Sequence, residues 1–261
     1  MEGVNMDEYM EPTEEEIQGE MDKTEYMQEE QEKQPKVLFK YRAIVNAVDL
    51  ARVLDILNNN RLYFPKVCEL NDPFEGGNVD CLSEEGNIKL MEERNTYRVL
   101  SLSADCFTPT LWAYYAHDAS GVCIGFHRQN NFYRAEQVEY KETVDKQQWI
   151  SFEPSDALSL EYVYKNLVWS HEKEYRIGHK EGEEFFEFEE YEFACLILGN
   201  NIDTEIENLI IETAKTKDIR IFKLNVDWRR SRYFLTPLGN EEKRIYEIGE
   251  LLEALGSCKP E

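Results

Sequence analysis

The sequence predicts a single α+β domain that follows an acidic tail. The chain has 261 residues, of which 42% are hydrophobic, so it is long and apolar enough to bury one sizeable core. Short apolar runs of strand length are interspersed with segments whose apolar residues recur at helical spacing. Residues 1–34 lack both patterns. We therefore expect a disordered acidic tail over residues 1–34 and one domain over residues 35–261, with a mixed central sheet and flanking helices.

The tail is dominated by Glu and Asp, and only Lys23 and Lys33 oppose them. Like charges repel one another, and too little apolar surface is present to offset the entropy lost on ordering. We expect disorder or a loose helix that serves as a solubilising arm. The alternative is an acidic mimic that covers a basic site on a partner.

The folded part is expected to begin with a strand, a helix and a second strand. The Asn residues at 58–60 should end the helix, because Asn tolerates the left-handed conformation of a helix C-terminus. Pro65 should close the second strand. This order places Tyr41 and Arg42 near the end of the first strand, where α+β enzymes often keep groups that face a ligand.

The rest of the chain continues this pattern, and residues 195–224 form a strand–helix–strand unit of the kind that pairs in parallel. The predicted strands are residues 37–41, 61–64, 98–103, 121–126, 132–140, 185–188, 195–199, 219–224 and a short one near Tyr233. The predicted helices are residues 47–57, 84–94, 110–117, 156–169, 203–216 and 245–255.

The stretch around Glu172 and Glu174 carries the densest group of chemically useful side chains. If this stretch is extended, the two carboxylates point to the same face because they are two residues apart. Trp169 and Tyr175 would supply aromatic walls, and Arg176 would supply a fixed positive fork. One interpretation is a salt-bridged edge strand. The other is a paired-carboxylate site, in which one Glu holds a substrate hydroxyl and the other activates a nucleophile.

Two other segments contain candidate site residues with a structural alternative. Asn71 and Asp72 precede a proline and predict a turn, although together with Glu75 they could line a pocket. Trp112 and Tyr115 share one face of a predicted helix, where aromatic pairs pack in the core more often than they hold a cofactor.

Composition argues against several classes of function. The formal net charge is −24, so direct binding to nucleic-acid phosphates or to an anionic membrane is disfavoured. No apolar run is long enough to span a membrane, and the first residues do not resemble a signal peptide. The six cysteines are scattered, which favours free thiols in a reducing cytoplasm and no structural metal. Phosphate-cradling glycine motifs are absent from the sequence.

Six of these motifs, in this order, resemble the bacterial family called domain of unknown function 2971. The resemblance covers roughly residues 37–225 and by itself implies no activity. The motifs are Tyr41-Arg42, Asn71 to Glu75, Ser101 to Ser103, Trp112 to Tyr115, Gly121 to Phe126, and Trp169 to Arg176.

A second, more distant resemblance is to the ADP-ribosyltransferase fold. It implies that Arg42 binds the ribose or diphosphate of NAD and that Ser101 or Ser103 occupies the middle-strand position, with Tyr115 as a substitute. Glu174 would be the catalytic residue and Glu172 its companion on the acceptor side. The chain departs from that pattern, because Tyr-Arg stands where His is more usual and the middle residue is ambiguous.

The residue types suit cleavage of a nicotinamide–ribose bond. A carboxylate stabilises the oxocarbenium-like cation, an arginine binds a diphosphate, and aromatic faces hold the bases. The resemblance implies NAD as substrate, no metal, and a cytoplasmic bacterial or phage protein of toxin or phage-defence type that acts on an unidentified macromolecular acceptor. The rivals are a non-catalytic binding or regulatory module, and metal-dependent phosphodiester cleavage by four acidic residues. Those four are Asp72, Glu75, Glu172 and Glu174.

Overall fold

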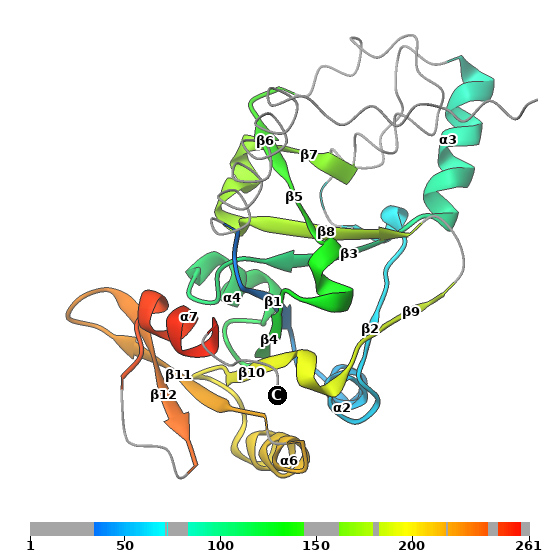
Figure 1. The fold of residues 1–261 in the computed structure, drawn as a ribbon. Coiled ribbons are helices and arrows are strands. Elements are labelled where there is room, and N and C mark those ends of the chain that lie inside the picture. Colours follow the sequence, from blue (N-terminus) through cyan, green and yellow to red (C-terminus); the bar gives the residue numbers. More distant parts are fainter. Residues whose placement is uncertain are drawn as a thin grey trace, which may run out of the picture. The chain divides into compact units, whose positions relative to one another are not determined.

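A computed structural model describes residues 34–70, 72, 83–143, 162–179, 183–217, 219–239 and 245–256. All but the first two of these residues belong to one compact unit, Lys36–Glu261. Within this unit an eight-stranded mixed sheet carries helices on both faces (Figure 1), which confirms the predicted α+β class. The predicted tail, apart from residue 34, lies outside the described residues.

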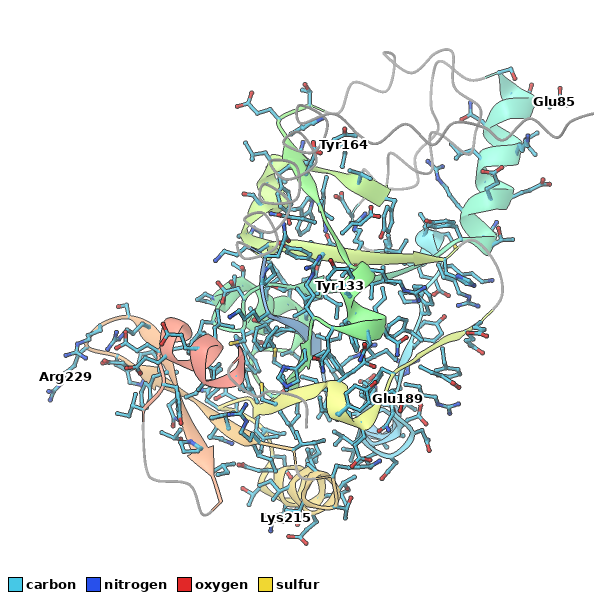
Figure 2. The ribbon with its side chains drawn as sticks, in the orientation of Figure 1. Glu85, Tyr133, Tyr164, Glu189, Lys215 and Arg229 are labelled. Carbon is cyan, nitrogen blue, oxygen red and sulfur yellow. The ribbon has the colours of Figure 1, made fainter. Side chains whose placement is uncertain are left out.

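Helices and strands follow one another along the chain without a regular alternation. Side chains surround the sheet on its faces (Figure 2). The strands are β1 (Val37–Arg42), β2 (Arg61–Tyr63), β3 (Arg98–Ser103), β4 (Val122–His127), β5 (Glu136–Gln137), β6 (Glu139–Lys141), β7 (Tyr164–Asn166), β8 (Glu174–His179), β9 (Phe185–Glu187), β10 (Phe193–Leu198), β11 (Ile221–Asp227) and β12 (Arg232–Leu238). The α-helices are α2 (Ala47–Asn59), α3 (Glu84–Thr96), α4 (Pro109–Tyr115), α6 (Thr204–Lys215) and α7 (Ile248–Gly256). The 3₁₀ turns are η1 (Val67–Glu69), η2 (Asn130–Arg134), η4 (Leu167–Glu172) and η5 (Glu190–Glu192).

The main sheet has the strand order β12-β11-β10-β4-β1-β3-β8-β5, and β2-β9 and β6-β7 form two small additional sheets. Its neighbours are antiparallel except for β10 and β11, which run parallel and are joined through α6. The strand–helix–strand unit predicted from the sequence is therefore confirmed. A parallel pair needs such a crossover, because a tight turn can only reverse the chain.

Strand β1 pairs much more extensively with one neighbour in the sheet than with the other. On one side, β1 pairs with β4 along all six of its residues. On the other side, the β1–β3 register contains a single pair, Phe39 opposite Ser103. The two strands therefore diverge away from that pair, and the separation leaves room for side chains between them.

Two buried clusters lie on opposite faces of the sheet, as the alternation along β1 shows. Leu38 belongs to the cluster that includes residues of α2 and α6, whereas Phe39 and Tyr41 belong to the cluster that includes residues of α4 and α7. Successive side chains of a strand point to opposite faces, so Lys40 lies on the same face as Leu38.

The helix caps follow the expected chemistry. The Asn46 side chain accepts hydrogen bonds from the main-chain N–H groups of Val48 and Asp49 and begins α2. Asn60 ends that helix in the left-handed conformation, with φ = 50°. The predicted Asn terminus of the helix is confirmed. Among the described residues, no helix has both the length and the apolar character needed to cross a membrane.

Two element predictions are wrong. Residues 132–140 were expected as one strand, but the turn η2 occupies their beginning and two short strands, β5 and β6, follow. Residues 156–169 were expected as a helix, and residues 156–161 lie outside the described residues. Residues 162–163 are helical, but the strand β7, paired in parallel with β6, and then η4 follow, so the helix does not continue to residue 169. The Asn166 side chain accepts from the Val168 N–H and starts η4. Pairing between distant segments therefore overrides the local helical spacing.

Candidate functional site

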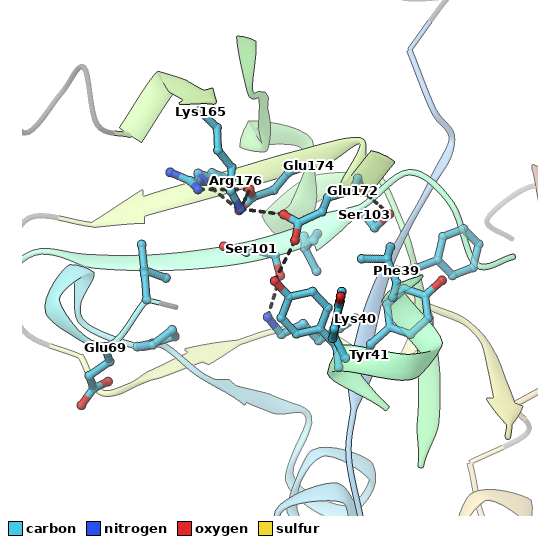
Figure 3. Close-up of a pocket in the computed structure, with 16 residues that line it drawn as sticks. Phe39, Lys40, Tyr41, Glu69, Ser101, Ser103, Lys165, Glu172, Glu174 and Arg176 are labelled. Carbon is cyan, nitrogen blue, oxygen red and sulfur yellow. Dashed lines mark hydrogen bonds and ion pairs between the residues drawn. The ribbon is translucent and has the colours of Figure 1, made fainter. Parts of the chain in front are cut away.

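A pocket of about 420 Å³ lies where β1 and β3 diverge. Its walls come from β1, β3, α4, η1 and the segment from β7 to β8, so residues far apart in the sequence meet there (Figure 3). The lining residues are Phe39, Lys40, Tyr41, Pro65, Glu69, Leu70, Ser101, Leu102, Ser103, Leu111, Tyr114, Tyr115, Lys165, Glu172, Glu174 and Arg176.

Glu172 and Glu174 reach the pocket by a turn rather than by one extended segment. Glu172 ends η4, Lys173 adopts the left-handed conformation with φ = 45°, and Glu174 begins β8. The Lys173 side chain leaves in another direction and pairs with Asp105 at 2.8 Å. The expectation of one extended stretch is wrong, but the expected convergence is present. Lys165 Nζ lies 2.6 Å from Glu172 Oε2 and 3.0 Å from Glu174 Oε2.

Glu174 is held by a second cation as well. Arg176 Nε donates to Oε1 at 2.8 Å and its Nη2 donates to Oε2 at 3.0 Å, so the guanidinium grips the carboxylate with two bonds. Burial by itself would raise the pKa of Glu174. The charges of Arg176 and Lys165, together with hydrogen bonds from Arg176 and Ser101, outweigh burial and lower the pKa to about 2. Glu174 is therefore an ionised, fixed group at neutral pH.

Glu172 is buried but less fully occupied by partners. The Tyr115 hydroxyl donates to its Oε1 at 2.7 Å, and Lys165 donates to its Oε2 at 2.6 Å. Ser103 Oγ donates to the Glu172 main-chain carbonyl at 2.7 Å, which fixes the backbone at this point. Ser103 and Tyr115, both candidate site residues from the sequence, thus each contact Glu172.

Lys40 enters the pocket from the opposite strand, β1. Its Nζ donates to the Ser101 main-chain carbonyl at 2.6 Å (Figure 3). Burial and the nearby charge of Arg42 lower its pKa to about 7, although Glu174 and Glu172 act in the other direction. The same pocket therefore holds one lysine clasped by two carboxylates and another whose amine is partly neutral near pH 7.

Two predicted aromatic residues lie elsewhere. Trp112 is fully buried, donates to the Cys106 carbonyl at 2.8 Å, and packs edge-on against Tyr41 with ring centroids 5.2 Å apart. It belongs to the core and is not part of the pocket lining. Tyr175 also packs in a buried cluster, because it lies on the face of β8 opposite to Glu174 and Arg176.

Arg42 lines a neighbouring pocket of about 580 Å³. Arg52 and Arg61 line it too, and Arg61 is paired with Asp55 at 3.0 Å. Glu69 lines both this second pocket and the first one, so the two pockets adjoin there. Arg42 therefore stands beside the site that contains the glutamates rather than inside it.

The loop after β2 contributes different residues from those expected. Asp72 is buried, with 2% of its surface exposed, while Asn71 and Glu75 lie outside the described residues. Glu69 and Leu70, just before that loop, line the pocket instead. In the parts of the chain that the structure describes, no group of three or more His, Cys, Asp or Glu residues could hold a metal ion.

Sequence reasoning missed Lys40, Lys165 and Glu69. Lys40 gives one usable signal, because it is a charged residue that directly follows three apolar residues and so interrupts the apolar run of the first strand. Lys165 gives no such signal, since it falls in a segment whose spacing favours a helix. Its position depends on the β6–β7 pairing.

Comparisons with protein-family models, with curated proteins and with solved structures found no match to this chain. The resemblances to domain of unknown function 2971 and to the ADP-ribosyltransferase fold therefore stay predictions, and the candidate site depends on its own geometry.

Proposed function

We propose that the pocket binds a ribosyl nucleotide and supports cleavage of its N-glycosidic bond, with NAD as substrate and either water or a macromolecule as ADP-ribose acceptor. The observation that carries this proposal is the convergence of Glu172 and Glu174 on Lys165 at the wall of a pocket of about 420 Å³. Fixed carboxylates at such a wall can stabilise the positive charge that develops on the ribose as nicotinamide leaves.

The two carboxylates are suited to different roles. A carboxylate offers about four acceptor positions. Glu174 uses three of them, for two bonds from Arg176 and one from Lys165, whereas Glu172 accepts two side-chain bonds, from Tyr115 and Lys165. Glu172 therefore has room for a ribose hydroxyl. We assign contact with the ribose to Glu172, and to Glu174 the positioning of Lys165, which reverses the roles implied by the resemblance.

The remaining walls suit the other parts of a dinucleotide. Tyr114 lines the pocket with an exposed ring that could stack on a base. Arg42, in the adjoining pocket, is of the right type for a phosphate. The boundary residue Glu69 would lie between these two parts of the ligand.

The alternative is a non-catalytic binding module in which the ion pairs only hold β8 in place. The bidentate Arg176–Glu174 pair favours this alternative, because both groups are almost completely buried. The pocket beside the pair favours a site instead, since a purely structural pair needs no adjoining cavity.

The test is to incubate the protein with NAD and a bacterial lysate and to follow nicotinamide release and transfer of an adenylate label. The native protein should release nicotinamide, and Glu172→Gln should reduce the rate at least ~100-fold. Both proteins are assayed well below their thermal midpoints, because loss of the buried pair with Lys165 also lowers stability. Glu212→Gln makes the same chemical change at an exposed position of α6 outside the pocket lining, and this matched control should leave the rate unchanged.

Unchanged turnover in Glu172→Gln would remove Glu172 from the reaction. If the native protein neither turns over NAD nor binds it in calorimetry, the binding-module alternative is preferred. In that case affinity capture on the native protein and on Glu172→Gln would identify a partner that depends on the pocket.

A further inference from the structure

The pocket contains two lysines in opposite electrostatic situations. Lys165 is 4% exposed in its side chain and lies within 3.0 Å of two carboxylate oxygens. Lys40 is half-buried, and within the described part of the chain its ammonium forms no ion pair. Its hydrogen bond is to a neutral main-chain carbonyl, that of Ser101. The environment therefore stabilises the charge on Lys165 and gives little support to the charge on Lys40.

The charged groups around Lys40 come from every neighbouring element. Arg42 on β1 and Lys165 on β7 oppose its protonation, while Glu172 at the end of η4 and Glu174 at the start of β8 favour it. The hydroxyl of Tyr115, on α4, donates a hydrogen bond to Glu172 Oε1 at 2.7 Å. An amine that is partly neutral thus faces a cavity that is also lined by the hydrogen-bonded Tyr115 and Glu172 side chains.

We propose that Lys40 is a nucleophilic amine that captures small aldehydes in this pocket as imines. A neutral amine has a free electron pair, and a desolvated lysine near other cations is a recognised way to produce one. The apolar side of the pocket, formed by Phe39 and Leu111, suits the carbon chain of such a compound. This site goes beyond the proposed glycosidic chemistry, because it requires neither NAD nor an acceptor.

The step is balanced without any redox partner. The Nζ electron pair attacks the carbonyl carbon, and the π electrons of the C=O bond move to the oxygen, which takes up a proton. One proton leaves the nitrogen, which gives a carbinolamine. The nitrogen electron pair then forms the C=N bond as the C–O bond breaks, and the hydroxyl takes up a proton and leaves as water while the nitrogen releases its second proton. Amine and aldehyde thus give imine and water, and water in the pocket can carry the protons.

The experiment is reductive alkylation of the native protein with propanal and cyanoborohydride at pH 7, followed by peptide mass spectrometry. Each lysine then reports its own rate of imine formation. Lys40 should be propylated at least ~10-fold faster than Lys165, whose amine is held by two carboxylates, and than the exposed Lys215, because the lowered pKa of Lys40 leaves part of its amine neutral at this pH. Repeating the reaction from pH 6 to pH 9 should show the Lys40 rate rising and then levelling off above pH 7, where its amine is mostly neutral.

The variant Lys40→Arg keeps a positive charge and cannot form an imine. Its labelling pattern should match the native one at every lysine other than Lys40. Labelling of Lys40 no faster than of Lys215 would overturn the proposal, whether the cause is a charged or an inaccessible amine. Because NAD takes no part, this result is independent of whether the protein cleaves NAD.

Discussion

The two sides of the pocket differ in how completely their charges are matched. On the β7–β8 side, Lys165, Glu172, Glu174 and Arg176 form a continuous chain of contacts between 2.6 and 3.0 Å. On the β1 side, Lys40 contacts only a main-chain carbonyl among the hydrogen bonds of the described residues. We infer that the β7–β8 side holds its side chains in fixed positions, whereas on the β1 side the protonation of Lys40 can change near neutral pH. The following predictions test that division.

The largest effect should come from removing a cation on the matched side. Arg176→Met leaves the Glu174 carboxylate buried with a reduced complement of positive charge, so the free energy of unfolding should fall by about 3–5 kcal/mol in urea denaturation. The exposed pair Lys215–Glu212 is the control, and Lys215→Ala should cost less than about 1 kcal/mol. A similar small loss for both variants would show that the buried chain is not the structural side.

Acid should reduce the contribution of the β7–β8 side to the free energy of unfolding. The pKa of Glu174 falls from 4.5 to about 2 in the folded protein, so its stabilisation is complete above pH 4.5 and is lost as the pH drops toward 2. The shift corresponds to about 3 kcal/mol over that window. Glu174→Gln removes this titration, so the native-minus-variant difference in unfolding free energy should decrease between pH 5 and pH 2. A difference that stays constant with pH would assign the low pKa to another group.

The contrast between the two sides also explains what sequence reasoning could reach. The strand that ends at Arg42 follows from a local apolar pattern, and the α+β class follows from the irregular alternation of strand-length apolar runs with helical spacing. The convergence of Glu172 and Glu174 was expected from their spacing, but the structure achieves it through the left-handed Lys173. The two-residue spacing therefore predicts that the carboxylates meet, which is correct, but it predicts an extended backbone between them, which is wrong.

The rest depends on pairing between segments that no local pattern encodes. Lys165 reaches the glutamates because β7 pairs with β6, although its surroundings have helical spacing. Lys40 faces a cavity because β1 and β3 share only one register pair. Trp112 lies in the core because its helix packs against β1 through Tyr41. Each of these facts is a tertiary contact, and propensity is a weak guide to such contacts.

A smaller effect is expected where the matched side meets helix α4. Tyr115→Phe removes the hydroxyl that donates to Glu172 Oε1 at 2.7 Å, and it should lower the free energy of unfolding by about 1.5 kcal/mol. Tyr114→Phe on the same helix is the matched control, because that ring is 70% exposed, and it should change stability by less than about 0.5 kcal/mol. Equal values for the two variants would show that the Tyr115 bond is replaced by water at no cost.

The smallest effect should have the opposite sign and concerns the unmatched side. The pKa of Lys40 falls from 10.5 to about 7 in the folded protein, so between these values the unfolded chain binds more protons and stability rises with pH. Below pH 7 the folded protein bears the full cost of a poorly supported charge. Lys40→Met should therefore raise the free energy of unfolding at pH 6, on the order of 1 kcal/mol after allowance for partial solvent contact. The gain should vanish as the pH approaches 10.5. If Lys40→Met destabilises the protein at pH 6, the lysine charge is well compensated and the two sides of the pocket are alike.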